Sequence, residues 1–324
     1  MHRKNGHKYG GAVRRGKAAM LRAWMSKILD VLDMAAPSLL LRLFYVSAAS
    51  GPLRERFIDY GSREAAPAPK AENGYEAQRK RIGGTAGALL DSVAAVRVPH
   101  AWFNHFYVLS LLVSCFWASQ ILSDGSFFEW LATREVVARS ASMSLDQAML
   151  AWAMMTFQAG RRLYECLDNH KPSASKMWVG HWAAGLAFYA AMGVAVWIEA
   201  SLRSLHIDPP SLRTFVGLPI FVLASGIQHD VHDHLASMKK YSLPKHPMFA
   251  TCICPHYLAE CFIYLSLAIV AAPQGHILNW TIVSGLMFVG INLGVTAKGT
   301  RLWYARKFND ERIMLKACMI PGIF

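Results

Sequence analysis

Residues 101–122 read AWFNHFYVLSLLVSCFWASQIL and contain no lysine, arginine, aspartate or glutamate. Because an α-helix rises about 1.5 Å per residue, about 20 apolar residues are enough to cross a hydrocarbon core of roughly 30 Å. The stretches 177–198 and 276–297 have the same length and are equally free of charged residues. These three stretches predict three membrane-spanning helices.

Further apolar stretches predict additional spans. Each is interrupted by a charged residue or a proline: 141–159 by Asp146, 212–227 by Pro219 and 254–272 by Glu260. A seventh stretch, 28–50, is broken by two aspartates, a proline and Arg42, so it either crosses the membrane or lies in the interface. The sequence therefore predicts an all-α, polytopic membrane protein with about seven transmembrane helices. Whether 28–50 is one of them stays open.

The composition agrees with a membrane protein. Hydrophobic residues make up 54% of the 324 residues and charged residues 17%, with a mean hydropathy of +0.23. This apolar content exceeds what a soluble domain of this size needs for its core. The net charge of +13 is spread over termini and loops, which argues against nucleic acid as a partner. We expect contact with membrane lipids, and no segment indicates an obligate protein partner.

The basic loops indicate topology, because positively charged loops stay in the cytosol. With seven spans, the loops within 54–97, 161–176 and 239–245 share one side with the C-terminal tail, which we expect to be cytosolic. The strongly basic N-terminus breaks this pattern, either as a weakly constrained tail or because only six helices cross. No cleavable secretory signal follows it. We divide the chain into a basic tail (1–27), N-terminal membrane helices (28–211) with a solvated loop (62–95), and a C-terminal membrane domain (212–324).

Three polar clusters lie on the predicted cytosolic side. FQAGRRLYECL (157–167) has Arg161, Arg162 and Glu165 at the end of a predicted span, where basic residues also snorkel without further function. GIQHDVHDHLASMKK (226–240) carries three histidines and two aspartates, which could bind a transition metal as in di-iron membrane hydroxylases. Such enzymes need several histidine boxes, so we predict no metal and a hydrogen-bonding role instead.

The third cluster, AKGTRLWYARKF (297–308), follows the last predicted span. It is either an interfacial anchor or a cationic cradle for the phosphates of a nucleotide. Glu260 is a functional candidate because a carboxylate within a membrane helix is costly, and it shares a helix face with His256. The six cysteines lie mostly in or beside apolar runs and include one C-x-C without a partner pair, so we expect packing roles.

Taken together, several motifs resemble a known family. CPHYLAECFIY (254–264), QHDVH (228–232), WYARKF (303–308) and the terminal IPGIF (320–324) resemble the C-terminal domain of the steroid 5-alpha-reductases, over roughly residues 226–324. FIDYGSRE (57–64), VRVPHAWFNHFYVLSLL (96–112) and RRLYECL (161–167) resemble the polyprenol reductases, the dolichol-forming branch of that family.

The resemblance implies a seven-helix enzyme of the endoplasmic reticulum membrane that uses NADPH and acts on a long-chain polyprenyl lipid, on the route to dolichol for protein N-glycosylation. His256 and Glu260 are implied contacts of the nicotinamide end. By motif, the residues implied around the cofactor are Gln228, His232, His256, Glu260, Arg301 and Tyr304, and Lys316 takes the place of a basic residue in the family's tail.

Two positions depart from the family pattern. Steroid-reducing members have a tyrosine that polarises the steroid ketone three residues before the arginine that corresponds to Arg162, and here that position is Ala159. The family usually has histidine at the position of Arg301. The first departure argues against a steroid substrate, and the second leaves the role of Arg301 open.

The chemistry narrows the substrate. Hydride addition to a carbon–carbon double bond needs a group that delocalises the resulting negative charge, and an aldehyde oxygen does this where an allylic alcohol does not. We therefore expect polyprenal more than polyprenol, reduced at the α-isoprene double bond. Glu260 and Tyr164 are the predicted catalytic residues, with His105 and Tyr107 as other possible proton donors. The alternatives are a non-enzymatic lipid transporter or scaffold, or a di-iron hydroxylase or desaturase.

Overall fold

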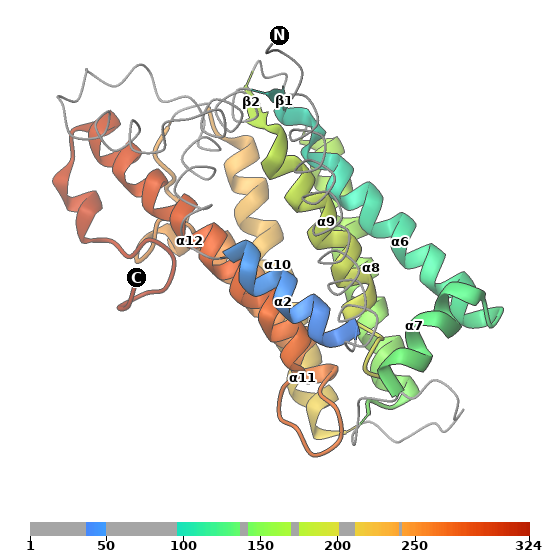
Figure 1. Cartoon of the computed structure of the whole chain (residues 1–324). Helices are drawn as coiled ribbons and strands as arrows, with labels where there is room; N and C mark the ends of the chain where they lie inside the picture. Colours follow the sequence, from blue (N-terminus) through green and yellow to red (C-terminus); the bar gives the residue numbers. More distant parts are fainter. Residues whose placement is uncertain (1–36, 50–95, 137–141, 170–174, 201–210, 240–241) are drawn as a thin grey trace, which may run out of the picture.

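The computed structural model describes residues 37–49, 96–136, 142–169, 175–200, 211–239 and 242–324, and in these ranges the chain is a bundle of α-helices (Figure 1). The predicted tail 1–27 and the loop 62–95 lie outside the described residues. The helices are α2 (Pro37–Ala49), α6 (Asn104–Leu122), α7 (Ser126–Val136), α8 (Leu145–Asp168), α9 (Val179–Ala195), α10 (Leu212–Ser237), α11 (Pro255–Val270) and α12 (Trp280–Phe308).

Short elements mark one end of the bundle, which we call the β end. There β1 (Arg97–Pro99) and β2 (Lys176–Trp178) pair antiparallel, with Val98 opposite Met177. The 3-10 segment η1 (His100–Phe103) leads from β1 into α6, η2 (Pro247–Phe249) precedes α11, and η3 (Glu311–Leu315) follows α12. Figure 1 shows the β pair at the top, and α12 projects to the upper left before the chain turns back to its C-terminus.

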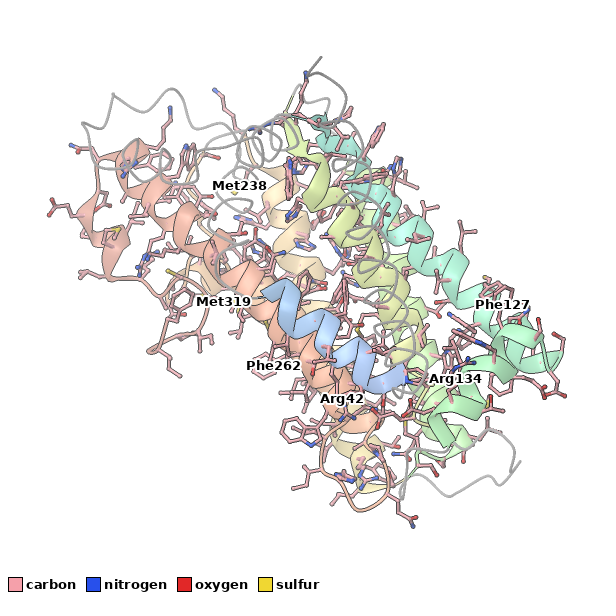
Figure 2. The ribbon with its side chains drawn as sticks, in the orientation of Figure 1. Arg42, Phe127, Arg134, Met238, Phe262 and Met319 are labelled. Carbon is pink, nitrogen blue, oxygen red and sulfur yellow. The ribbon has the colours of Figure 1, made fainter. Side chains whose placement is uncertain are left out.

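Contacts at the opposite end, which we call the far end, hold the loops of the other side. Met143 forms a parallel bridge with Ala200, and the Gln147 amide donates to the backbone oxygens of Val270 and Ala272 at 2.8 and 3.0 Å. In Figure 2, Arg42 and Arg134 lie toward this end, whereas Met238, which directly follows α10, lies at the other. The helices therefore connect two opposite ends of one bundle.

Three helical segments in the described ranges are long and apolar enough to cross a membrane: His100–Leu122, Leu212–Ser237 and Trp280–Phe308. Pro37–Val46, Val179–Ala195 and Pro255–Val270 are apolar but shorter. The prediction of a helical membrane protein agrees with this fold.

Several predicted boundaries are wrong. The stretch 177–198 starts in β2 and its helix, α9, ends at Ala195, because Lys176–Trp178 is taken up by pairing with β1. The stretch 212–227 continues as α10 to Ser237 despite Pro219, since the polar side chains of its second half find partners on other helices. WYARKF does not follow the last span as a separate tail. It is the end of α12, which stops at Asn309 in the left-handed conformation.

Local signals explain two helix starts. Ser144 and Gln147 form a capping box at the start of α8, in which each side chain bonds the other residue's backbone N–H. The Asn279 side chain accepts from the backbone N–H of Ile282 at the start of α12, while its amide donates to the Ala271 oxygen at 3.0 Å. Asn279 thus starts α12 and holds the preceding loop against α11.

Helix α2 belongs to the bundle. Tyr45 has no exposed surface and joins the main apolar core with residues from α8, α9, α11 and α12. Polar contacts fix the helix at the far end, where Ser38 donates from its backbone and hydroxyl to the buried Glu135 of α7. The Arg42 guanidinium donates to Glu199 at 3.0 Å and to the Thr281 hydroxyl at 2.9 Å. Arg42, one of the residues that interrupt the apolar run 28–50, therefore helps to hold α2 against the bundle.

Candidate active site

The site is built around a buried carboxylate at the β end of α8. Glu165 is 3% exposed and forms ion pairs with Arg161 and Arg162, one turn earlier on the same helix. The Nδ1 atoms of His229 and His232 on α10 lie 2.9 Å from its two oxygens. The i, i+3 and i+4 spacing places both arginines beside the carboxylate. Two helices are joined here by one charged group.

A second group of polar side chains lies next to this one and contains Glu260. The Gln158 amide donates to Gln228 at 2.9 Å and to Glu260 at 3.3 Å, and Gln228 also donates to Glu260. The Arg161 guanidinium donates to the Gln158 oxygen at 2.8 Å and to the Gln228 oxygen. Helices α8, α10 and α11 are therefore connected by one hydrogen-bond network, which we call the amide–carboxylate network (Gln158, Arg161, Gln228, Glu260).

Aromatic side chains border both groups. The Arg162 Nε donates to the Tyr107 hydroxyl at 3.3 Å, and its guanidinium lies 5.3 Å from the centre of the Tyr107 ring. The imidazoles of His232 and His256 lie edge to face with ring centres 5.3 Å apart. A cation over an aromatic face is favourable, particularly away from water. Helix α6 thus contributes Tyr107 to a site that is otherwise formed by α8, α10 and α11.

Two cationic residues, one in α12 and one in the C-terminal segment that follows it (309–324), lie in a separate group. Arg301 of α12 donates to the backbone oxygen of Lys316 at 3.0 Å, and the Lys316 ammonium donates to the Phe249 oxygen at 2.8 Å. The backbone N–H groups of Ile253 and Cys254 donate to Ala317 and Cys318. This pairing sets the C-terminal segment beside the start of α11, two and three residues before His256.

The predicted site residues thus fall into three sets. Gln228, His232, His256 and Glu260 come together around the amide–carboxylate network. Arg301, Tyr304 and Lys316 lie at the second half of α12 and the C-terminal segment, where Tyr304 packs against a small apolar core. Tyr164 forms the third set by itself, because its side chain is 61% exposed on the outer face of α8.

The sequence prediction missed Gln158 as a site residue and left Glu165 with Arg161 and Arg162 between a helix end and a site. One signal was available, because positions 158, 161, 162 and 165 follow the i, i+3, i+4 and i+7 pattern of one helix face. A face of polar residues on an apolar helix needs partners on a neighbouring helix. The pattern could therefore have indicated a buried polar face.

Three of the described cysteines lie in or beside the C-terminal segment. Cys252, Cys254 and Cys318 are free thiols buried at the junction of the C-terminal segment and α11. Burial raises the pKa of the Cys252 thiol above its usual value, so the protonated form dominates. Within the described ranges, the histidines, cysteines and carboxylates include no group of three or more arranged to hold a metal ion.

Comparisons with known proteins identify a family and several relatives that this chain resembles. Residues 175–324 match the family described as 3-oxo-5-alpha-steroid 4-dehydrogenase. The chain is 27% identical to a polyprenal reductase of Caenorhabditis elegans over 256 residues, covering 71% of this chain and 81% of the relative. It is 29% identical to a polyprenal reductase of Saccharomyces cerevisiae, covering 73% and 79%.

A third relative, an uncharacterized protein of Schizosaccharomyces pombe, is 31% identical over 195 residues, covering 59% of this chain and 68% of the relative. The family match begins well before residue 226 and includes β2, α9 and the three helices that follow. It therefore contains Gln228, Glu260 and the C-terminal segment. The chain belongs to the steroid 5-alpha-reductase family, whose members are oxidoreductases that act on carbon–carbon double bonds.

Proposed function

We propose that this protein reduces the α-isoprene double bond of a polyprenyl lipid, polyprenal in preference to polyprenol, with NADPH as the reductant. The observation that carries the proposal is the amide–carboxylate network, in which Glu260 accepts from the amides of Gln158 and Gln228 inside a helical membrane protein. The similarity to polyprenal reductases supports the choice of substrate class.

The chemistry of the side chains fits NADPH. A nicotinamide carboxamide needs one acceptor and one donor, and Glu260 with Gln228 provides both kinds of group. The buried Nε atoms of Arg161 and Arg301 have no hydrogen-bond partner among the described residues, and an anionic phosphate is a suitable acceptor for such donors. We assign Gln228, His232, His256 and Glu260 to the nicotinamide end, and Arg301, Tyr304 and Lys316 to the phosphate end.

NADPH bound here would supply a hydride to the β-carbon of the terminal isoprene unit. The electron pair of the double bond would move toward the carbonyl, and the α-carbon would take a proton from water or a side chain. The negative charge that develops during hydride addition is delocalised onto the aldehyde oxygen, so a hydrogen-bond donor to that oxygen lowers the barrier. Tyr107 is a better candidate than Tyr164 for the proton donor to the α-carbon, because its hydroxyl contacts Arg162 in the site and Tyr164 is exposed on the outer face of α8.

We further propose that α2, α6, α8, α9, α10, α11 and α12 all cross the membrane of the endoplasmic reticulum. The β end then faces the cytosol, where NADPH is available, and the product enters the route to dolichol for protein glycosylation. Lys176 of β2 and Lys239, which follows α10, belong to this end, which agrees with the charge rule.

The purified protein in detergent is expected to oxidise NADPH with polyprenal, and far more slowly with polyprenol of the same chain length. The alcohol has no group that delocalises the charge from hydride addition. A 3-oxo-4-ene steroid should give no turnover, because Ala159 replaces the tyrosine expected in steroid-reducing relatives. NADPH absorbance and mass spectrometry of the lipid measure both products. Equal rates with alcohol and aldehyde would refute the conjugate-addition mechanism, and steroid turnover without prenyl turnover would refute the substrate class.

A lipid transporter or scaffold is the competing function, and nucleotide binding separates the two. We expect NADPH to bind saturably and more tightly than NADH. Arg301→Ala should weaken NADPH binding by on the order of ten-fold, since it removes one charge-assisted contact to phosphate. Titration calorimetry of the detergent-solubilised protein measures both. Absence of saturable NADPH binding in a folded preparation would favour the transporter.

A further inference from the structure

Four tyrosines from four different helices meet inside the bundle, next to the proposed site but deeper in the core. They are Tyr45 of α2, Tyr107 of α6, Tyr189 of α9 and Tyr264 of α11. Tyr45, Tyr107 and Tyr264 are at most 5% exposed. Tyrosine in an apolar core carries a hydroxyl that needs a partner, whereas phenylalanine would fill the same space without that need.

Three of these tyrosines are linked to Arg162 by a hydrogen bond or to Glu260 of the amide–carboxylate network by electrostatics. The Tyr107 hydroxyl accepts from Arg162, and the rings of Tyr107 and Tyr189 meet edge to face with centres 5.5 Å apart. A hydrogen bond joins the hydroxyls of Tyr189 and Tyr264, and Glu260 acts electrostatically on both. Tyr264 follows Glu260 by four residues, so it lies on the same helix face about 6 Å further from the β end.

Tyr45 differs from the other three. It has no exposed surface, and its hydroxyl has no hydrogen-bond partner among the described residues. Its ring packs edge to face on Phe188 at 5.7 Å, and Phe188 packs on Tyr264 at 5.6 Å. A Cβ on Gly285 of α12 would lie 3.6 Å from Cζ, the carbon that bears the Tyr45 hydroxyl. The hydroxyl-bearing end of the ring therefore lies over Gly285, inside the core.

An unsatisfied hydroxyl in an apolar core costs free energy, so its presence calls for a partner that the described residues do not provide. The partner must be polar and must reach the core from within the membrane. It must also lie beyond Glu260 as seen from the β end. The oxygen-bearing end of a long apolar lipid has these properties, since its hydrocarbon part partitions into the bilayer and the polar end can enter the protein from there.

Resting on the proposed function, we infer that the hydroxyls of Tyr45 and Tyr264 hold the terminal oxygen of the lipid substrate, with Tyr45 as the donor to that oxygen. Tyr189 then positions Tyr264 through their shared hydrogen bond. Glu260, one turn nearer the β end, stays available for the nicotinamide carboxamide. The arrangement sets the reacting double bond between the two groups and selects an oxygen-terminated prenyl chain over a hydrocarbon.

The test compares binding of two lipids of equal chain length, a prenyl aldehyde and the corresponding prenyl hydrocarbon without oxygen. Quenching of intrinsic tryptophan fluorescence in detergent measures both affinities, in wild type and in Tyr45→Phe. We expect wild type to prefer the aldehyde by about five-fold, as one additional hydrogen bond implies, and Tyr45→Phe to lose that preference. The turnover number of Tyr45→Phe should fall by at least ten-fold, with NADPH affinity within two-fold of wild type.

Thermal unfolding provides the structural readout. Because the Tyr45 hydroxyl has no hydrogen-bond partner in the part of the chain that the structure describes, Tyr45→Phe should unfold at the same temperature as wild type or higher. Phe44→Leu, which changes the neighbouring ring without a hydroxyl, should keep the aldehyde preference. If Tyr45→Phe keeps both preference and turnover, or wild type shows no preference, the oxygen site is wrong while the proposed function can stand. If wild type prefers the aldehyde but does not oxidise NADPH with it, the proposed reaction fails and the oxygen site stands.

Discussion

Glu165→Gln is expected to destabilise the protein by about 3–5 kcal/mol, because it removes the charge shared by two arginines and two histidines at the β end. The side chains of Arg161 and Arg162 are only 11% and 13% exposed, so water cannot replace the lost carboxylate charge. Thermal unfolding in detergent measures the effect, and we expect the midpoint to fall by about 10 °C.

The matched control is Asp310→Asn. Asp310 also pairs with an arginine, Arg312, at 2.9 Å, but that arginine is 86% exposed. Solvent-exposed ion pairs contribute little to stability, so the unfolding midpoint of this variant should stay near that of wild type. A midpoint for Glu165→Gln as high as that of the control would contradict the central role of the carboxylate in joining α8 to α10.

Glu260→Gln is expected to reduce turnover by ten-fold or more while leaving the fold intact. A glutamine oxygen can still accept from Gln158 and Gln228, so the contacts that Glu260 makes within the chain persist. Its amide nitrogen, however, offers a donor where the proposed contact to the nicotinamide carboxamide needs an acceptor. One buried polar group left unpaired costs about 1–3 kcal/mol, which corresponds to this loss of rate.

Steady-state kinetics with polyprenal and NADPH, together with an NADPH titration, test this expectation. Glu129→Gln serves as the control, since Glu129 lies on the exposed face of α7 near the far end. Wild-type turnover in Glu260→Gln would assign Glu260 a structural role only. The two carboxylates are thereby distinguished, because Glu165→Gln acts on stability and Glu260→Gln acts on catalysis.

The general architecture could be predicted from the sequence because it depends on local properties. The length and apolar character of 101–122 predicted α6, and the helices of 276–297 and 141–159 were found with shifted ends. Helix ends depend on single contacts, such as the capping box of Ser144 and the pairing of β2 with β1, which hydropathy does not report. The packing of the helix within 28–50 also depends on residues distant in the sequence, since Glu135 bonds Ser38 and Glu199 bonds Arg42 in the first turns of α2.

The site could be predicted only in part, for a physical reason. The resemblance to the family brought Gln228, His232, His256 and Glu260 into one prediction, and they lie together. Periodicity shows which residues share a face of one helix, but not how neighbouring helices rotate or at what depth they pack. Only the packing of α8 against α10 and α11 brings Gln158 and Arg161 to Gln228 and turns Tyr164 outward. Only the docking of α2 over Gly285 buries Tyr45 against Phe188, because contacts between distant segments are decided by the bundle and not by either segment alone.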